Sequence, residues 1–189
     1  MRRVFIYCLL SFITSSCTEA TNNFKAEDYF PKTQKDYLRY YVLTKDTLKT
    51  VFKYKESENA LIEICETAVG NPSAFYYKYE DDRITIYSYS VGSGTWGIGE
   101  LFLSNPIKLN ESYNKKQDYK NNYVYKQIDK LEEFNGIRDC IEIQEFFYDN
   151  ETKESKLICS NIYAKGIGSI AACVYRDGER KIVWIRKES

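Results

Sequence analysis

The sequence contains no histidine, and this absence excludes several kinds of chemistry. Ser-His-Asp and Cys-His catalysis both need an imidazole, and histidine is also the commonest protein ligand of metal ions. None of the six cysteines stands in a C-x-x-C pair, so a zinc site is not expected either. We therefore expect a protein that is not an enzyme and that holds no metal and no cofactor.

The chain also lacks an excess of charge of one sign. It has 27 basic and 27 acidic residues, and no block of Lys or Arg stands out along it. Proteins that bind nucleic acid usually present a clustered basic face to the phosphates. We therefore expect no nucleic-acid partner.

Long apolar runs are scarce too, since only Val4 to Ile13 is almost purely apolar. Spanning a bilayer takes ~20 residues, and this run is too short. It follows Met1-Arg2-Arg3 and precedes the small or short polar residues Thr14-Ser15-Ser16. A basic start, an apolar core and such a cleavage region are typical of a secretory signal peptide. We predict that residues 1–16 form this signal and that the protein is exported.

Cys17 directly follows the predicted cleavage region. This position is similar to that of the lipidated cysteine in bacterial lipoprotein signals, although an ordinary cysteine beside a conventional cleavage site is the alternative. Two or more acyl chains on Cys17 would anchor the protein stably to a membrane. Thr18 stands where an Asp would have suggested retention at the inner membrane. We therefore expect a lipid-anchored envelope protein at the outer membrane.

The remainder predicts a short tether and one domain. Residues 17–28 are polar and show no periodicity, which is typical of a flexible tether. Residues 29–189 are rich in aromatic and β-branched residues, which favour strands. No segment shows a long apolar repeat of 3.6 residues. We predict a single, mainly β domain with little helix, built as a curved antiparallel sheet or partial barrel of about nine or ten strands.

Turn residues divide this domain into strands. Asp177-Gly178 is a strong hairpin signal because both positions of a type I′ turn need positive φ. Glu80-Asp81-Asp82 and Asp149-Asn150-Glu151-Thr152 are the other clear turns. The expected strands are 37–43, 47–55, 60–66, 75–79, 83–89, 98–103, 123–131, 137–148, 155–163, 170–175 and 181–185.

Four cysteines follow Cys17, at positions 65, 140, 159 and 173. An exported protein can oxidise such cysteines, although four buried free thiols are an equal alternative. A two-residue turn at Asp149-Asn150 would place Cys140 directly opposite Cys159, and a slip of two residues would leave them diagonal on one face. This pair is the predicted disulfide.

The segment Gly92-Ser-Gly-Thr-Trp-Gly-Ile-Gly99 lacks the Lys-Ser/Thr of a phosphate-binding loop, and no helical pattern follows it. Its Trp96 is a candidate contact residue for a ligand or partner, because glycines let a backbone approach closely. Tyr87 and Tyr89 share one face of the preceding strand. The alternative is that Tyr87 and Tyr89 face a core sealed by Trp96.

Carboxylates remain as possible catalytic groups in a chain without histidine. Acidic pairs stand at Asp81-Asp82 and Glu132-Glu133. A glycosidase-type site needs two carboxyl groups a few ångströms apart across a cleft. Both pairs are more typical of solvated turns, so a carboxylate-based hydrolase is a distant alternative.

Three segments together resemble a group of small, mostly uncharacterised bacterial lipoproteins. They are Asp28-Tyr-Phe-Pro31 leading to Tyr37-Leu-Arg-Tyr40, Phe134-Asn-Gly-Ile-Arg-Asp-Cys140-Ile-Glu-Ile143, and Tyr163-Ala-Lys-Gly-Ile-Gly168-Ser-Ile170. The family often has Gly and Trp after the first Pro, where this chain has Lys35 and Leu38. The resemblance implies a curved antiparallel sheet like the half-barrel of periplasmic lipoprotein carriers, whose concave face can take acyl chains. The expected function is therefore binding of an apolar ligand or an envelope protein, and the alternative is a purely structural or protein-interaction module of the envelope.

Overall fold

The computed structural model describes residues 24–67, 71–90, 94–117 and 122–187. The predicted signal peptide, Cys17 and most of the predicted tether lie outside these residues. No helix in the described part of the chain has the length and apolar character needed to cross a membrane.

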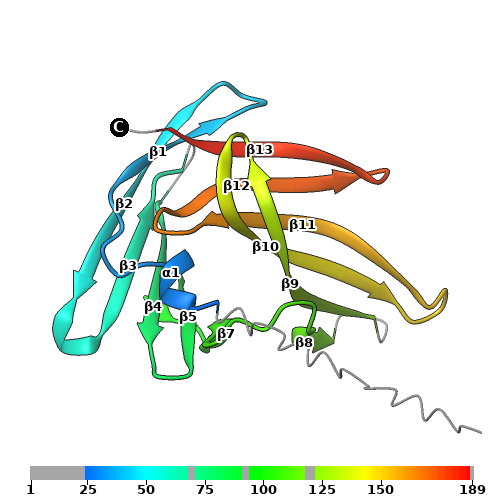
Figure 1. Cartoon of the computed structure of the whole chain (residues 1–189), viewed down its shortest axis with the longest axis horizontal. Coiled ribbons are helices and arrows are strands. Elements are labelled where there is room, and N and C mark those ends of the chain that lie inside the picture. Colours follow the sequence, from blue (N-terminus) through cyan, green and yellow to red (C-terminus); the bar gives the residue numbers. More distant parts are fainter. Residues whose placement is uncertain (1–23, 68–70, 91–93, 118–121, 188–189) are drawn as a thin grey trace, which may run out of the picture.

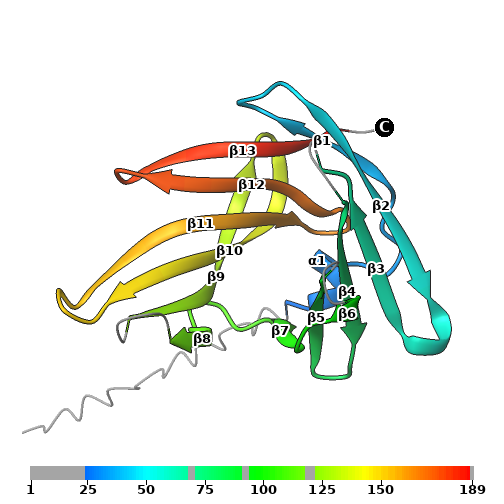
Figure 2. The same cartoon turned by 180° about the vertical axis from the view of Figure 1, so that it is seen from behind.

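The described residues form one large curved antiparallel sheet that does not close into a barrel, as Figures 1 and 2 show. The strands are β1 (Tyr37–Tyr41), β2 (Thr47–Lys55), β3 (Ala60–Cys65), β4 (Ser73–Tyr79), β5 (Arg83–Ser90), β6 (Thr95–Trp96), β7 (Glu100–Ser104), β8 (Tyr113–Gln117), β9 (Tyr123–Phe134), β10 (Ile137–Asp149), β11 (Glu154–Ala164), β12 (Gly168–Arg176) and β13 (Glu179–Lys187). Their order across the sheet is β6-β5-β4-β3-β2-β1-β13-β12-β11-β10-β9-β8, and β7 pairs with β5. The only helical turns among these residues are α1 (Ala26–Tyr29) and η1 (Glu56–Glu58).

The predicted mainly β fold is confirmed, but the described residues hold thirteen strands rather than nine or ten. β6 and β8 are the two strands that none of the expected ranges covers. β6 has only two residues and β8 pairs irregularly with β9. A strand of two residues carries too few alternating residues for a sequence pattern to mark it.

Local turn chemistry forms the hairpins. Asp177 and Gly178 adopt φ values of 54° and 80° between β12 and β13, as a type I′ turn requires. The Asp149 side chain accepts hydrogen bonds from the backbone N–H groups of Glu151 and Thr152, which closes the turn between β10 and β11.

The register of β10 and β11 contradicts the predicted Cys140–Cys159 disulfide. Asp149 pairs with Glu154, so the turn has four residues instead of two, and a bulge follows near Ile158. Cys140 therefore lies opposite Ala164, whereas Cys159 lies opposite Glu145. Five residues along a strand correspond to about 16 Å, far beyond the reach of a disulfide. The four cysteines of the described residues are free thiols.

The N-terminal end of the domain is packed into the fold, which corrects the predicted tether boundary at residue 28. Ala26 and Tyr29 of α1 are buried, and Phe30 is 1% exposed. The Phe24 carbonyl accepts a hydrogen bond from the Ile107 backbone. A four-residue helical turn is too short to produce a periodic pattern, so the sequence did not reveal it.

The three segments that carry the sequence resemblance meet around this N-terminal turn. The Asp28 carbonyl accepts a hydrogen bond from the Gly166 backbone at 2.6 Å, and Lys165 donates to the Asp139 carbonyl at 3.0 Å. Gly168 has a φ of 90°, and a Cβ there would lie 2.5 Å from the Gln34 side chain. A side chain at Gly168 would thus strain the backbone and displace Gln34.

Alternation along the strands separates two cores on opposite faces of the sheet. The larger core lies on the inner face, where α1 packs, and includes Phe30, Tyr77, Phe102, Ile141 and Tyr163. Cys140 and Ile162 precede Ile141 and Tyr163 in the chain and belong to a smaller core on the outer face. Because successive side chains of a strand point to opposite faces, the sheet is apolar on both sides over β10–β12.

Candidate functional site

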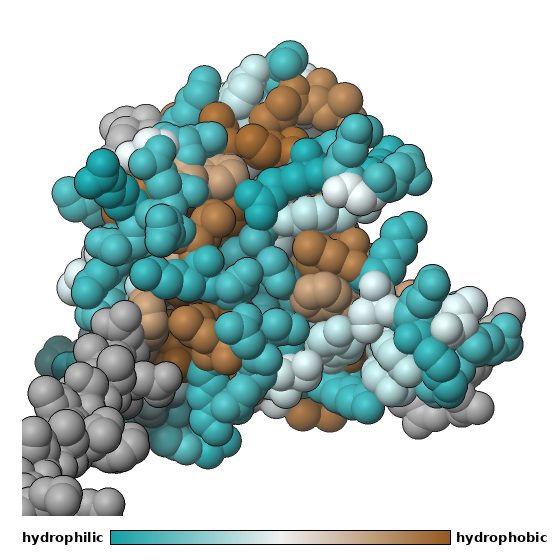
Figure 3. Space-filling view, turned by 45° about the vertical axis from the view of Figure 1, so that its right-hand side comes forward, coloured by the Kyte–Doolittle hydropathy of each residue, from teal (hydrophilic) through white to brown (hydrophobic). Residues whose placement is uncertain are grey.

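A cavity of about 240 Å³ lies on the inner face of the sheet. Side chains from β1, β3–β5 and β7–β13 surround it, together with Phe30 next to α1. Figure 3 shows apolar residues (brown) lying between hydrophilic ones on one side of the molecule. The aromatic lining residues are Phe30, Phe75, Tyr77, Phe102, Tyr113, Tyr163 and Trp184. Ring pairs such as Phe30–Phe102 and Phe102–Tyr163, with centroids 4.9 and 5.6 Å apart, pack edge to face and stiffen this wall.

One side of the cavity carries a buried charged pair, Arg39 and Glu63. Arg39 lies on β1 and Glu63 on β3, with β2 between them. The Arg39 Nη2 and the Glu63 Oε1 are 3.8 Å apart, within ion-pair range but too far for a hydrogen bond. Arg39 Nε donates to the Thr50 hydroxyl at 2.6 Å, and the guanidinium lies 5.4 Å from the Trp184 ring centre. The Arg39 Nη2 is buried without an acceptor within hydrogen-bond distance.

Glu63 is more fully engaged than its partner. Its Oε2 accepts a hydrogen bond from the Tyr77 hydroxyl at 2.7 Å, and its Oε1 accepts a weak one from the Cys65 thiol at 3.4 Å. Burial, followed by the charge of Glu63, raises the pKa of Cys65 to about 12. The same two causes raise the pKa of Tyr77. Both groups therefore keep their protons at neutral pH and act as donors to Glu63.

A second pair of charges lines the cavity on β9 and β10. Glu145 pairs across the strands with Lys126, and Cys159 lies opposite Glu145 on β11. Burial, and then the charge of Glu145, raise the pKa of the Cys159 thiol. Burial is also the largest cause of the raised pKa at Cys140 and Cys173. Because a thiolate is the nucleophilic form of cysteine, none of these thiols is activated for attack.

The predicted contact residues lie outside this cavity, on the outer face. Tyr89 pairs with Trp96 across β5 and β6, and their ring centres are 5.1 Å apart. Trp96 is 40% exposed and Tyr89 is 37% exposed, so neither seals a core. Tyr76 of β4, which the sequence did not single out, joins them through ring contacts with Tyr87 and Trp96. We call these four residues the outer aromatic patch.

Gly99 shows why a glycine follows this patch. A Cβ at Gly99 would lie 2.6 Å from the Tyr87 ring and 2.9 Å from Thr85. The glycine therefore lets the chain pass directly against the Tyr87 ring, which holds this ring beside Tyr76. Its role here is close packing.

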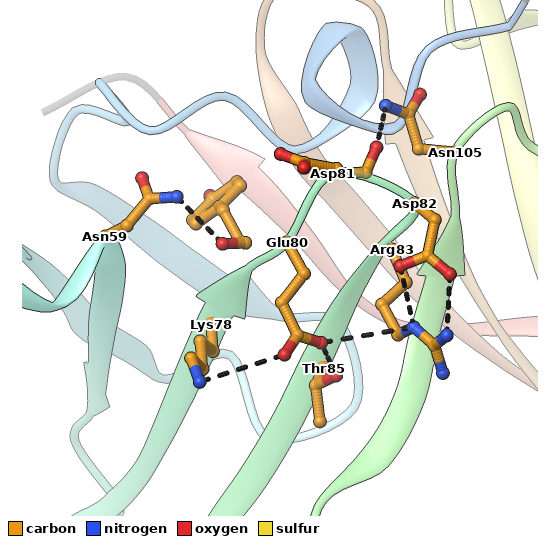
Figure 4. A network of polar contacts seen from close by, with 9 residues as sticks. Asn59, Lys78, Glu80, Asp81, Asp82, Arg83, Thr85 and Asn105 are labelled. Carbon is orange, nitrogen blue, oxygen red and sulfur yellow. Dashed lines mark hydrogen bonds and ion pairs between the residues drawn. The ribbon is translucent and has the colours of Figure 1, made fainter.

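The acidic pairs of the sequence do not line the cavity. Asp81 and Asp82 occupy the turn between β4 and β5, where Asp82 pairs with Arg83 at 2.6 Å. Figure 4 shows this turn in a network of polar contacts that includes Glu80 and Asn105. Glu132 and Glu133 stand near the far end of β9, and Glu133 pairs with Arg138. The first pair thus lies in a turn, as expected, whereas the second lies at the end of a strand, and one member of each pair forms an exposed ion pair.

The outer face buries a second glutamate, Glu142, which is 2% exposed. Its Oε1 accepts hydrogen bonds from Ser160, Tyr175 and Arg180 at 2.6–2.9 Å. Its Oε2 accepts from Gln144 and again from Arg180. Every carboxylate oxygen is satisfied by the protein, so this cluster has the character of a structural contact.

Sequence reasoning singled out Tyr87, Tyr89 and Trp96 of the outer aromatic patch but not the residues that line the cavity. Each of its charged residues stands inside an alternating strand pattern, for example Arg39 within Tyr37-Leu-Arg-Tyr40 and Glu63 within Leu61-Ile-Glu-Ile-Cys65. One signal could have identified these charged residues as facing the core: the residues two positions away on the same strand are apolar.

No group of three metal-ligating side chains is present among the described residues. Comparison of the chain with models of protein families and with curated proteins gave no match.

Proposed function

We propose that this protein is a non-enzymatic lipoprotein of the bacterial envelope whose β domain binds an apolar molecule on its inner face. The observation that carries this proposal is the cavity of about 240 Å³ with an aromatic wall. Ligand sites are typically concave and mostly apolar, with a few polar groups that orient the ligand. The two charged pairs at this cavity correspond to such polar groups.

Two tryptophans provide a direct test of where a ligand binds. Trp184 lines the cavity, whereas Trp96 belongs to the outer aromatic patch. Trp96→Phe leaves Trp184 as the only tryptophan, and Trp184→Phe leaves Trp96. Binding in the cavity should change the fluorescence of the first variant and leave that of the second unchanged. The opposite result would place the ligand at the outer patch and overturn the assignment to the cavity.

Native mass spectrometry of the mature protein from its own host tests the proposal without choosing a ligand in advance. We expect a small organic molecule to accompany the wild-type protein. Tyr163→Trp, which adds bulk to the cavity wall, should reduce the bound fraction while Trp96→Phe should not. A wild-type protein that carries no molecule and binds no apolar probe would contradict the proposed function.

The anchoring part of the proposal is supported by the sequence around Cys17. Metabolic labelling with a clickable fatty acid should tag the wild-type protein and miss Cys17→Ala. The membrane fraction should hold the wild type, and Cys17→Ala should appear in the soluble envelope fraction. Equal labelling of both proteins would show that Cys17 is not the lipidated residue.

A protein-interaction module is the second candidate function, favoured by the exposed outer aromatic patch. Ile64 lies on the same face and is 38% exposed, close to the values for Tyr89 and Trp96. Grouped exposed apolar residues of this kind often mark contact surfaces. Trp96→Ala should then lower the yield of a cross-linked envelope partner and leave cavity fluorescence in place. Loss of cavity binding without loss of cross-linking would count against this second candidate.

A further inference from the structure

We infer that the molecule bound in the inner cavity is a small organic acid whose carboxylate is held by Arg39. This inference rests on the proposed function and names the class of ligand. It follows from the unused hydrogen-bonding capacity of the cavity, from the position of its charges and from its size.

Among the described residues that line the cavity, the buried side-chain atom without a hydrogen-bond partner is a donor, the Arg39 Nη2. Glu63 already accepts hydrogen bonds from Tyr77 and Cys65, and Glu145 faces the protonated thiol of Cys159. By contrast, Arg39 donates through Nε to Thr50, and its Nη2 is buried without an acceptor among the described residues. A buried donor without an acceptor costs about 1–3 kcal/mol. A ligand that supplies an acceptor relieves this cost.

The cavity also holds a second cation. Lys126 lines the cavity and forms no ion pair within 4.0 Å among the described residues. Its neighbour across the strands is Glu145, which balances its charge without a close contact. Arginine binds carboxylates through two parallel N–H groups, and such charge-assisted bonds are about twice as strong as neutral ones. A carboxylate is therefore the acceptor that suits Arg39 best.

The cavity volume limits the rest of the ligand. About 240 Å³ corresponds to roughly eight water-sized groups, and a dry cavity of about 150 Å³ accommodates benzene. One ring with a short acidic arm fits this space between Phe30, Phe102 and Trp184. A long acyl chain would extend out of it. The inference therefore separates a compact acid from a long-chain lipid.

The test compares two probes of equal size, 3-phenylpropionate and 3-phenylpropan-1-ol. Each probe is titrated into the mature lipoprotein, which carries Trp96→Phe and is embedded in nanodiscs, and Trp184 fluorescence is recorded. Empty nanodiscs are the blank. We expect the acid to bind at least about tenfold more tightly than the alcohol, because only the acid gains charge-assisted bonds to Arg39. Sodium palmitate, which exceeds the cavity, should bind more weakly than the compact acid.

Two substitutions should change the affinity for the acid in opposite directions. Glu63→Gln removes the negative charge beside Arg39 and should tighten binding of the acid by about tenfold while leaving the alcohol unchanged. Arg39→Lys retains the charge but loses the fork of donors, so it should weaken binding of the acid. Arg180→Lys alters the arginine of the outer face and serves as the matched control with wild-type binding. Circular dichroism verifies that each variant is folded.

The outcomes distinguish this inference from the proposed function. Equal affinity for the acid and the alcohol, or no gain in Glu63→Gln, would overturn the acidic ligand and leave an apolar ligand in place. Tighter binding of palmitate than of 3-phenylpropionate would overturn the compact acid. If neither probe binds but a neutral molecule accompanies the purified protein, only this inference is wrong. If neither probe binds and no molecule accompanies the protein, the proposed function is wrong as well.

Discussion

Among the described residues, each face of the curved sheet carries an arginine–glutamate pair with a buried carboxylate, and the two pairs are built differently. On the outer face, Arg180 and Glu142 are joined by hydrogen bonds of 2.9 Å. Three further side chains donate hydrogen bonds to the same carboxylate. On the inner face, Arg39 and Glu63 stand 3.8 Å apart beside a cavity. An aromatic ring accompanies each arginine, Tyr175 on the outer face and Trp184 on the inner face.

The two pairs differ in how much of their hydrogen-bonding capacity is used within the protein. The outer pair uses nearly all its hydrogen-bonding capacity within the protein, so it holds β10–β13 together and offers little to a ligand. The inner pair leaves a buried N–H group without an acceptor. Buried polar groups in native proteins are normally satisfied, and an exception calls for an explanation. A ligand in the adjoining cavity is the explanation proposed above.

The largest expected effect comes from truncating the inner aromatic ring. Trp184→Ala should lower the free energy of unfolding by about 3–5 kcal/mol, because the ring is 8% exposed and its loss would enlarge the cavity. Trp96→Ala on the outer face should cost only about 1 kcal/mol, since that ring is 40% exposed. Urea denaturation measures both values. A Trp96→Ala cost equal to that of Trp184→Ala would show that the outer aromatic patch is part of a core.

The next effect compares the two glutamates directly. Glu142→Gln should cost about 3 kcal/mol, because it weakens the five hydrogen bonds that a 2% exposed carboxylate accepts. Glu63→Gln should cost less than half as much, since its contact with Arg39 is longer and lacks a hydrogen bond. The measurement is again denaturant unfolding, at one pH and salt concentration. Equal losses in the free energy of unfolding would contradict the distinction between the Arg180–Glu142 pair and the Arg39–Glu63 pair.

Alkaline pH should destabilise the protein through the inner face. The pKa of Cys65 rises from 9.0 to about 12 on folding, chiefly through burial, so above pH 9 the unfolded chain releases a proton that the folded chain keeps. This contribution to stability is complete below pH 9 and is lost as the pH rises towards 12. The loss amounts to at most about 1.4 kcal/mol per pH unit for each such group.

Cys65→Ala tests this assignment between pH 9 and pH 10, below the ordinary pKa of tyrosine. Its free energy of unfolding should fall less steeply with pH than that of the wild type. Cys173→Ala removes a second buried thiol, on the outer face, whose pKa is also raised by burial. It serves as the control for the loss of any one buried thiol. An unchanged slope in Cys65→Ala would contradict the raised pKa of Cys65.

The smallest expected effect concerns oxidation. Cys140 lies on the outer face and Cys159 on the inner face, so a mild oxidant should form no bond between them and leave the melting temperature unchanged. Alkylation of the denatured, unreduced protein followed by peptide mapping should find both thiols modified. A linked Cys140–Cys159 peptide would show that the register of β10 and β11 differs from the one described.

Short-range signals predicted most of the strands. The turns at Asp177-Gly178 and before Arg83 lie where the sequence predicted them. They could be predicted because a type I′ turn and a solvated loop each depend on a few adjacent residues. The register of β10 and β11 was wrong because it depends on the turn conformation and on a bulge near Ile158, which residue types alone do not specify. Residue types pointed to the outer aromatic patch and not to the cavity for a related reason. Alternation correctly grouped Tyr87 with Tyr89, but it cannot tell which face of a sheet becomes concave.

By itself, the sequence determined the mainly β composition, the positions of the hairpins and the residues that share a face of each strand. These properties follow from side-chain alternation and turn chemistry, which act over a few residues. Only the tertiary structure decided that Arg39 meets Glu63 across β2 and that seven aromatic rings enclose one cavity with them. Such contacts depend on how a whole sheet curves and on the N-terminal turn that packs against its inner face, and no local pattern encodes that curvature.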